Sequence, residues 1–164
     1  MKTIIVLLSI TIFQSCAQQS ENKNSSHKRD VINHDSLKFN FNGRALPENV
    51  CYVVKEGGTE RPFTGKYWNN HESGFYTCVA CDDTLFSSDT KYNSGSGWPS
   101  FYDVLTEGKV KKLDDYELGF LRIEIKCTKC NAHLGHVFED GPKPTGKRYC
   151  VNSASLNFLP LKTD

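Results

Sequence analysis

The chain of 164 residues lacks an excess of charge of either sign, with 20 lysines and arginines against 19 aspartates and glutamates. No segment is basic enough to neutralise a phosphate backbone, so we expect no nucleic-acid partner. A hydrophobic run long enough to cross a bilayer is also missing. The apolar residues 4–13 are too few to span a membrane, and their number suits the core of a signal peptide.

Small residues follow this apolar run at Ser15-Cys16-Ala17. A small residue directly before a cysteine resembles the bacterial lipoprotein signal, in which Cys16 is lipidated and becomes the first mature residue; cleavage after Ala17 is the alternative. Residues 17–43 are rich in Ser, Asn, Gln, Lys and Glu and contain too few apolar residues to fold. We therefore expect a signal peptide, a flexible tether and one folded domain exported to the bacterial cell envelope, at residues 1–16, 17–43 and 44–164.

Helical periodicity is absent beyond residue 58, and the strand–helix–strand spacing of a parallel sheet is absent throughout. Residues 119–126 instead alternate between apolar and charged side chains, which is typical of a strand with one buried face. Shorter strand candidates are residues 74–79, 134–138, 148–153 and 155–159. One short helix is expected from Leu46, with Pro47 in its first turn, to Gly57-Gly58. The sequence thus predicts a mainly β domain of antiparallel strands with a short N-terminal helical segment.

Two Cys-x-x-Cys pairs each follow a strand candidate and precede a polar turn: Cys78-Val79-Ala80-Cys81 and Cys127-Thr128-Lys129-Cys130. Two such knuckles together supply the four thiolates of a tetrahedral zinc site. Four sulfur ligands leave the ion no open position, so we expect structural zinc held by Cys78, Cys81, Cys127 and Cys130. The alternatives are two disulfides, which an exported protein can form, and a thioredoxin-like redox pair.

With these four cysteines and Cys16 assigned, Cys51 and Cys150 remain. Strand alternation along residues 148–152 places Arg148, Cys150 and Asn152 on one face. A guanidinium two positions away favours the thiolate, which is the reactive form of cysteine, and Asn152 can orient a bound polar group. Cys150 is therefore a candidate nucleophile. The alternative is an inert buried cysteine.

A pair of histidines follows the second knuckle in His133-Leu134-Gly135-His136. In a flat strand the two rings would face opposite ways, but a bulge at Gly135 could re-aim one of them. Beside a thiolate they could donate a proton to a leaving oxygen; the alternatives are a second metal pair and ordinary surface histidines. Trp98 follows a glycine-rich loop, where it could form an apolar wall for a small methyl-bearing group or belong to the core.

Four blocks of sequence occur in a family-specific order. They are Gly58-Thr59-Glu60-Arg61-Pro62-Phe63-Thr64-Gly65, Gly97-Trp98-Pro99-Ser100-Phe101, His133-Leu134-Gly135-His136-Val137-Phe138 with Asp140-Gly141-Pro142, and Arg148-Tyr149-Cys150-Val151-Asn152-Ser153-Ala154-Ser155-Leu156. Together they resemble the B class of methionine sulfoxide reductases, the peptide-methionine (R)-S-oxide reductases, over residues 46–159. The resemblance implies two antiparallel sheets, a structural zinc remote from the chemistry, and repair of proteins by reduction of the R epimer of methionine sulfoxide.

Carried over position by position, the resemblance makes Cys150 the nucleophile, which attacks the sulfoxide sulfur and becomes a sulfenic acid. Trp98 would hold the substrate methyl group, and Arg148 would help to keep Cys150 as thiolate. The sulfoxide oxygen would be surrounded by His133, His136 and Asn152. An external thioredoxin-like dithiol would then return Cys150 to its reduced form.

The chain departs from the family pattern at the resolving cysteine. Many members carry this thiol at the position of Ser96, and others near the position of Phe63. Cys51 is the only unassigned thiol in the predicted domain, although its apolar helical surroundings suit a core residue. Either Cys51 resolves the sulfenic acid, or the thiol of the reductant meets it directly.

Two other kinds of protein compete with this interpretation. One is a zinc-stapled binding module in which Cys150 is structural, and the other is a dithiol–disulfide oxidoreductase that uses its Cys-x-x-Cys pairs. Neither would reduce methionine sulfoxide. We expect a monomeric reductase whose partners are oxidised methionine residues in proteins and a thioredoxin-like reductant, and whose contact with the membrane is a lipid on Cys16.

Overall fold

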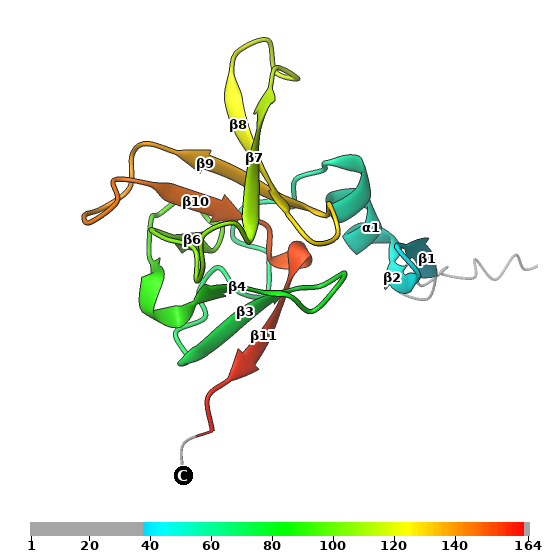
Figure 1. Ribbon diagram of the computed structural model, residues 1–164, viewed down its shortest axis with the longest axis horizontal. Helices are drawn as coiled ribbons and strands as arrows, with labels where there is room; N and C mark the ends of the chain where they lie inside the picture. Colours follow the sequence, from blue (N-terminus) through cyan, green and yellow to red (C-terminus); the bar gives the residue numbers. More distant parts are fainter. Residues whose placement is uncertain (1–37, 163–164) are drawn as a thin grey trace, which may run out of the picture. The chain divides into compact units, whose positions relative to one another are not determined.

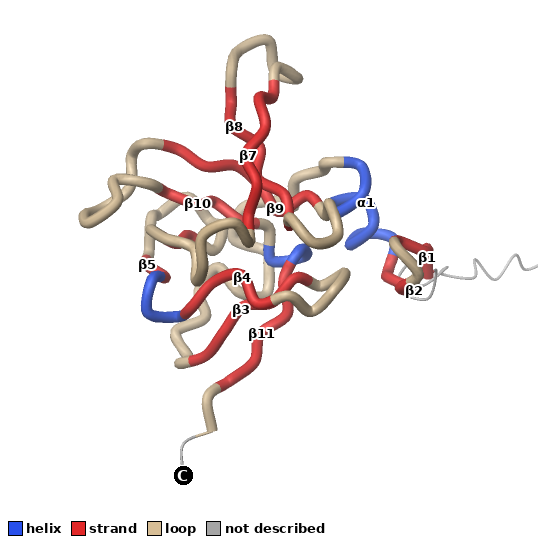
Figure 2. The backbone as a smooth tube through the Cα atoms, viewed as in Figure 1, coloured by secondary structure: helices blue, strands red, loops and turns tan. Residues whose placement is uncertain are grey.

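The computed structural model describes residues 38–162 of the chain. The predicted signal peptide and residues 17–37 of the predicted tether lie outside the described residues. The regular secondary structure of the described part consists mostly of strands, with one α-helix near its beginning (Figures 1 and 2). Within residues 38–162, no helix is long and apolar enough to pass through a membrane.

The strands form two main sheets. The larger sheet has the order β5 (Lys91–Tyr92), β6 (Ser100–Phe101), β10 (Arg148–Val151), β9 (His133–Phe138), β8 (Arg122–Cys127) and β7 (Val110–Asp115). The smaller sheet has the order β11 (Leu156–Pro160), β3 (Gly74–Cys78) and β4 (Thr84–Ser87). Short 3-10 turns, Ser88–Thr90 and Ser153–Ser155, follow β4 and β10. The strand pairs are antiparallel, which confirms the predicted mainly β fold.

The hydrophobic core lies between these two sheets. Tyr76 of β3 and Phe86 of β4 contact Phe101 of β6, with ring centroids 5.0 and 4.4 Å apart. Tyr149 of β10 lies 6.0 Å from the ring of Phe86. All four aromatic side chains are buried, as expected for the facing surfaces of two packed sheets. Because Tyr149 and Val151 of β10 point into this core, the residue between them points out of it.

Helix α1 (Glu48–Glu56) ends at Gly57, whose φ of 75° is the left-handed conformation that glycine adopts without strain. The predicted helix is confirmed, but it begins at Glu48 rather than at Leu46. Leu46 and Pro47 instead belong to strand β2 (Arg44–Pro47), and Pro47 precedes the helix. Such boundary shifts of one or two residues are ordinary where a strand runs directly into a helix.

A small hairpin formed by β1 (Lys38–Phe41) and β2 precedes the helix. Its turn is Asn42-Gly43, with φ of 51° and 83°. Positive φ at both central residues is the two-residue turn that Asn-Gly favours between antiparallel strands. The four residues of β1 lie in the segment predicted as a tether, so that prediction was wrong for them. The dipeptide Asn42-Gly43 is the feature of the sequence that indicates this hairpin.

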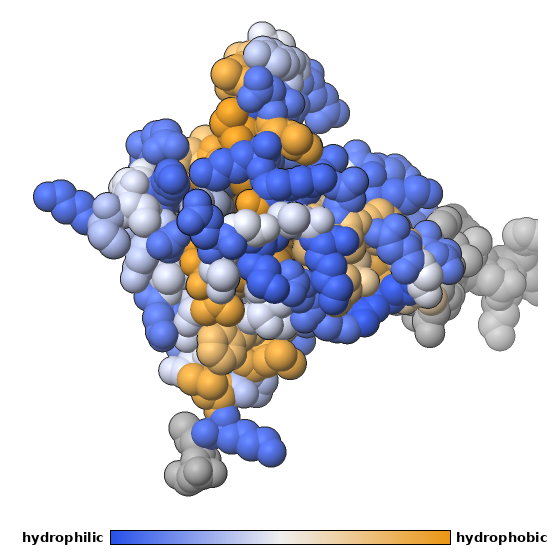
Figure 3. Space-filling view, viewed as in Figure 1, coloured by the Kyte–Doolittle hydropathy of each residue, from blue (hydrophilic) through white to orange (hydrophobic). Residues whose placement is uncertain are grey.

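The hairpin of β7 and β8 extends beyond the rest of the larger sheet, toward the top of Figure 1. Hydrophobic residues are visible on it in the space-filling view, among hydrophilic ones (Figure 3). The sequence predicted β8 but not β7, whose two lysines and two aspartates hide its alternation. Strands β4, β5 and β6 were not predicted either, since two of them have only two residues.

Candidate active site

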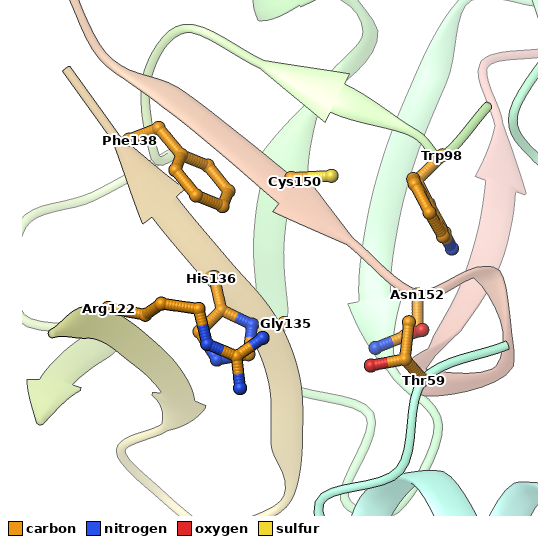
Figure 4. A pocket seen from close by; sticks show the side chains of 8 residues that line it. All are labelled: Thr59, Trp98, Arg122, Gly135, His136, Phe138, Cys150 and Asn152. Carbon is orange, nitrogen blue, oxygen red and sulfur yellow. The ribbon is translucent and has the colours of Figure 1, made fainter. Parts of the chain in front are cut away.

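Cys150 lies on the face of β10 that points away from the core. It lines a cavity of about 130 Å³ together with residues from four other parts of the chain (Figure 4). Trp98 comes from the loop before β6, His136 from β9, and Asn152 from the end of β10. The remaining lining residues are Thr59, Arg122, Gly135 and Phe138. The cavity therefore brings one thiol, one imidazole, one amide and one indole to a common space.

A bulge in β9 places the two histidines near each other. Ile125 of β8 pairs with Gly135, but the next residue of β8 pairs with His133, so Leu134 is left as the extra residue. The ring centroids of His133 and His136 are 5.6 Å apart as a result. Gly135 has φ of 152°, and a Cβ atom there would lie 2.1 Å from the carbonyl oxygen of Cys150. Only glycine lets β9 approach β10 this closely.

The position of His136 is fixed by a carboxylate that the sequence did not reveal. Its Nε2 lies 2.7 Å from Oδ2 of Asp115, which also accepts a hydrogen bond from Nη2 of Arg122 at 2.7 Å. The backbone N–H of Glu117 and the ring of His136 hold the pKa of the Asp115 carboxyl at about 2. Asp115 therefore stays ionised and orients His136, leaving Nδ1 of that ring for another partner.

His133 lies behind His136 and is not among the residues that line the cavity. Its Nδ1 is 2.6 Å from Oε1 of Glu124, and its Nε2 is buried without a hydrogen-bond partner among the described residues. Burial lowers the pKa of the His133 ring, although Glu124 acts in the opposite direction. The sequence thus predicted both histidines near Cys150, but the structure brings only His136 to the cavity wall.

The thiol of Cys150 is subject to opposing influences. Burial raises the pKa of Cys150 above its ordinary value, while the hydroxyl of Ser96 and the guanidinium of Arg148 lower it by less. The Ser96 oxygen is 3.8 Å from the sulfur. Arg148 is itself held by Asp140, which accepts hydrogen bonds of 2.8 Å from Nε and Nη2. Arg148 thus lowers the pKa of Cys150, as predicted, but the increase in pKa caused by burial is larger.

Asn152 and Trp98 are both anchored to Glu60, a residue whose role could not be predicted from the sequence. The side-chain oxygen of Asn152 accepts a hydrogen bond of 3.0 Å from the Glu60 N–H, and its Nδ2 donates to the carbonyl of Leu134. The indole Nε1 of Trp98 donates to the Glu60 carbonyl at 3.0 Å. The carboxylate of Glu60 accepts backbone N–H groups that follow Asn152. One residue therefore sets the relative positions of two cavity walls.

Cys51 lies elsewhere in the fold. It belongs to α1, is 5 % exposed, and is part of the hydrophobic core. Burial raises the pKa of its thiol. Cys51 does not line the cavity of Cys150, whereas the side chain of Ser96 is in contact range of Cys150. The structure therefore places a hydroxyl, not a second thiol, beside the candidate nucleophile.

The four knuckle cysteines meet at a separate place, where the β3–β4 turn faces the β8–β9 turn. Their sulfur atoms all lie within 4.8 Å of one another. The separation of 3.5 Å between Cys78 and Cys130 and of 3.6 Å between Cys81 and Cys127 is far longer than a disulfide bond. It is near the roughly 3.8 Å between sulfurs that tetrahedral zinc–sulfur bonds of about 2.3 Å produce. The donor set fits a metal ion.

Backbone groups around the knuckles complete this cluster. The N–H groups of Ala80 and Ala132 point at the sulfurs of Cys78 and Cys130, as suits thiolate ligands. The β1–β2 hairpin contacts both knuckles, because Arg44 donates to the carbonyl of Val79 and Asn42 to the carbonyl of Cys130. None of the four cysteines lines the cavity of Cys150.

A family model described as the SelR domain matches residues 46–160. Peptide methionine sulfoxide reductase MsrB of Methanosarcina barkeri (strain Fusaro / DSM 804) is 59 % identical over 115 residues, which cover 70 % of this chain and 81 % of that protein. The protein of the same name from Methanosarcina mazei is 57 % identical over 113 residues, 69 % of this chain and 81 % of the relative. Among solved structures, the crystal structure of the Mis18 'Yippee-like' domain matches with a TM-score of 0.46 and 18 % sequence identity. The match covers 56 % of this chain and 100 % of that chain. This likeness is too slight to support a conclusion. The matched segment contains both knuckles, Trp98 and Cys150, and the chain belongs to the SelR-domain family, that of the MsrB methionine sulfoxide reductases.

Proposed function

We propose that this chain reduces the R epimer of methionine sulfoxide residues in proteins to methionine, with Cys150 as the nucleophile. The relatives named as peptide methionine sulfoxide reductases support the reaction. The observation that carries the assignment of the nucleophile is the shared cavity, where Cys150 lies with Trp98, His136 and Asn152. The cavity of about 130 Å³ has room for the end of a methionine side chain.

The chemical step exchanges one oxygen atom between two sulfur atoms. The thiolate of Cys150 attacks the sulfoxide sulfur, and the oxygen takes up protons as its bond to that sulfur breaks. The oxygen leaves as water, and attack of water on the Cys150 sulfur then breaks the new bond between the two sulfur atoms and releases one proton. Methionine leaves reduced by two electrons, and Cys150 becomes a sulfenic acid oxidised by two electrons. His136, held by the ionised Asp115, is placed to donate a proton to the oxygen.

The other residues in and around the cavity bind or position the reacting groups and do not themselves react. The indole of Trp98, fixed through Glu60, provides an apolar wall for the methyl group of the substrate. Asn152, whose amide is held at both ends, contacts the sulfoxide oxygen from the side opposite His136. Arg148 favours the thiolate of Cys150, and His133 supports His136 from behind. These contacts make one epimer fit with its oxygen toward His136 and its methyl toward Trp98.

The oxidised enzyme needs a thiol from another molecule. A thiol condenses with the sulfenic acid to form a mixed disulfide and water, and a second thiol of the same reductant reopens that disulfide. We propose that both thiols come from a thioredoxin-like dithiol, since Ser96 occupies the place beside Cys150 and Cys51 is buried in the core. Replacement of Cys51 by serine should then leave the number of thiols lost in one turnover unchanged.

We propose that Cys78, Cys81, Cys127 and Cys130 hold a structural zinc ion. Four thiolates close the coordination shell, so the ion supplies folding energy and no reactive water. The cluster lies outside the cavity of Cys150, which supports a role in stability. One zinc per chain, measured in the purified protein by elemental analysis, is the expected result.

We further propose that the domain is exported and that a lipid on Cys16 holds it to the membrane. We also propose that it is a monomer. The proposal rests on the apolar residues 4–13 and the small residues around Cys16. Mass spectrometry of the mature N-terminus should find a diacylglyceryl-modified Cys16. An unmodified terminus at Gln18 would show ordinary cleavage after Ala17 instead. Sedimentation of residues 38–164 should give the mass of one chain.

The activity is tested with N-dabsyl-methionine sulfoxide of each epimer, with dithiothreitol as reductant. We expect turnover of the R epimer, none of the S epimer, and none by the Cys150→Ser variant. A folded, metal-loaded wild type without turnover would favour the zinc-stapled binding module. Stoichiometric zinc in the purified protein, with full activity retained after mild oxidation, would show that the knuckle pairs have no part in electron transfer, which would exclude the dithiol–disulfide oxidoreductase.

A further inference from the structure

Four large apolar side chains are exposed at the end of the β7–β8 hairpin. Their exposed fractions are 63 % for Tyr116, 59 % for Leu118, 59 % for Phe120 and 53 % for Leu121, and we call these residues the apolar tip. Gly119 closes the turn, with φ of 80° and an N–H that donates to the carbonyl of Tyr116. A cluster of this kind on a projecting turn contributes nothing to the core and marks a site of interaction (Figures 1 and 3).

The apolar tip adjoins Arg122, a residue that lines the cavity of Cys150. It lies between Asp115 and Arg122, which are paired across the two strands and joined by a hydrogen bond of 2.7 Å. Arg122 lines the cavity, and Asp115 holds His136. A methionine residue whose side chain enters the cavity must leave its neighbours in the polypeptide outside. The surface that begins at Arg122 is therefore within reach of those neighbours.

The chemistry of the hairpin indicates what it binds. Strand β7 is the free edge of the larger sheet, but Lys111, Lys112 and Asp114 discourage an added strand there. Between Asp115 and Arg122, Glu117 carries the one charge, and its side chain is 78 % exposed. Contacts are therefore made by apolar side chains rather than by backbone pairing or charge.

We propose that the apolar tip docks apolar side chains next to an oxidised methionine in an unfolded polypeptide segment. The proposal rests on the reductase function above, which requires a polypeptide to approach this cavity. Methionine is apolar and is usually buried in a folded protein, so segments that expose it on unfolding also expose apolar neighbours. The hairpin then selects unfolded, oxidised chains over sulfoxides in polar surroundings.

The test compares three substrates of the full chain. The first is N-acetyl-methionine R-sulfoxide, which has no neighbouring residues that could contact the apolar tip. The other two are nine-residue peptides with a central methionine R-sulfoxide, one flanked by leucine and valine and the other by serine and glycine. The variant is Leu118→Ser with Phe120→Ser. The matched control is Leu161→Ser, which removes a side chain of similar exposure, 52 %, beyond the end of β11.

For the double variant we expect kcat/KM on the leucine–valine peptide to fall about tenfold, mainly through KM, because two apolar contacts are lost. The activities on the acetylated amino acid and on the polar peptide should stay within about twofold, and the control should match the wild type on all three. Equal losses on all three substrates, or no loss on the leucine–valine peptide, would overturn the docking surface while leaving the reductase function intact. Absence of wild-type activity on every substrate would overturn both.

Two further measurements exclude other occupants of the tip. Binding of residues 38–164 to phosphatidylglycerol vesicles that is lost in the double variant would assign the apolar tip to the membrane instead. A dimer in sedimentation that becomes a monomer in the double variant would assign it to a second copy of the chain. We expect neither result, and either one, combined with unchanged activity on the leucine–valine peptide, would overturn the proposal.

Discussion

At the scale of single residues, the reactivity of Cys150 depends on how burial is balanced by two polar neighbours. Burial makes the cavity suitable for the apolar end of methionine, but it disfavours the charged thiolate that must attack. Ser96 and Arg148 offset part of this effect. Binding of the apolar substrate therefore favours a buried cavity, whereas formation of the thiolate favours polar surroundings, and the same few side chains determine both.

This balance predicts the pH dependence of Cys150 in the reduced enzyme. Because its pKa is raised above the ordinary value of about 8.5, the thiolate is the minor form at neutral pH, and the rate of alkylation by iodoacetamide should rise with pH beyond 8.5. In Arg148→Ala the pKa rises further, so alkylation at pH 8 should be about fivefold slower. Mass spectrometry of the Cys150 peptide measures both rates. A midpoint below 8.5 in the wild type would contradict the prediction.

The contact between Ser96 and Cys150 predicts what a thiol would do in that place. The serine oxygen is 3.8 Å from the sulfur, a separation that small side-chain rotations can close to a disulfide. After one turnover without reductant, the wild type should lose one thiol and Ser96→Cys should lose two. Thiol titration of the denatured protein measures this. If the wild type also loses two, and Cys51→Ser restores the loss of one, then Cys51 is the resolving thiol.

Whether a site residue could be predicted from the sequence depended on how far along the chain its hydrogen-bond partner lies. Cys150 and Asn152 could be placed on one face because strand alternation is a local property. Asp115 and Glu60 could not be assigned, since they meet His136 and Asn152 only through strand pairing and loop packing between distant segments. In the sequence, Asp115 and Glu60 cannot be told apart from the many charged residues that lie on the surface. The opposing effects of burial and of Arg148 on the pKa of Cys150 could not be predicted without the fold either.

Asp115 orients a proton donor, and its effect should be visible in kcat. Asp115→Asn removes the charge beside His136 with little change in volume, so kcat should fall about tenfold to 100-fold, near the lower end of what general acid catalysis contributes. Since the pKa of Asp115 is about 2, its ionisation should produce no step in the wild-type profile between pH 5 and 9. Steady-state kinetics over that range tests both points. Unchanged kcat in the variant would remove Asp115 from the mechanism.

At the scale of secondary-structure elements, the bulge in β9 is what joins the histidine pair to the nucleophile strand. The sequence indicated it through Gly135, which interrupts an otherwise regular strand. Other elements were less accessible from sequence. Strand β7 is an edge strand rich in charge, and the β1–β2 hairpin depends on a turn dipeptide next to a polar segment. In strands that are little buried, the alternation of apolar and polar residues is weak, because neither face of the strand packs against the core.

The close approach of β9 and β10 predicts a large cost for any side chain at Gly135. In Gly135→Ala the new Cβ would lie 2.1 Å from the carbonyl oxygen of Cys150, so the strands must separate. We expect a loss of about 3 kcal/mol in the free energy of unfolding and a loss of activity of at least about 100-fold. Gly146→Ala is the control, since it also has positive φ, 72°, but nothing lies within 4 Å of its Cβ. Urea denaturation that shows equal costs at the two sites would contradict this explanation.

At the scale of the whole domain, the cysteine cluster connects the two sheets. One knuckle joins β3 to β4 in the smaller sheet, and the other joins β8 to β9 in the larger sheet. The same two sheets enclose the aromatic core and hold β10 in place. A metal ion in the cluster therefore stabilises the packing on which the cavity depends, although it lies outside that cavity.

Removal of the metal should act through folding. We expect one equivalent of zinc per chain, and a Cys81→Ser variant should lose it and unfold at a temperature lower by at least about 10 °C. Activity and circular dichroism should disappear together when the wild type is treated with a chelator. A metal-free protein that keeps its circular dichroism but loses activity would point to a catalytic ion instead. Ser153→Ala, distant from the knuckles in sequence, controls for substitution at a buried polar site.

The overall architecture was the most predictable level, because it follows from general properties of the sequence. Alternation without helical periodicity indicates antiparallel sheets, and paired knuckles indicate a shared metal ion. The family resemblance over residues 46–159 is confirmed by the SelR match to residues 46–160. The signal peptide, the lipid on Cys16 and the exported location stay predictions.

The most direct test of the central claim is a single turnover of the reduced enzyme without added thiol. One equivalent of a peptide containing methionine R-sulfoxide is mixed with the enzyme, the sulfenic acid is trapped with dimedone, and the products are identified by mass spectrometry. We predict one methionine formed per chain and one dimedone adduct, located on Cys150. Formation of methionine by Cys150→Ser, or an adduct on a different cysteine, would contradict the assignment of Cys150 as the nucleophile.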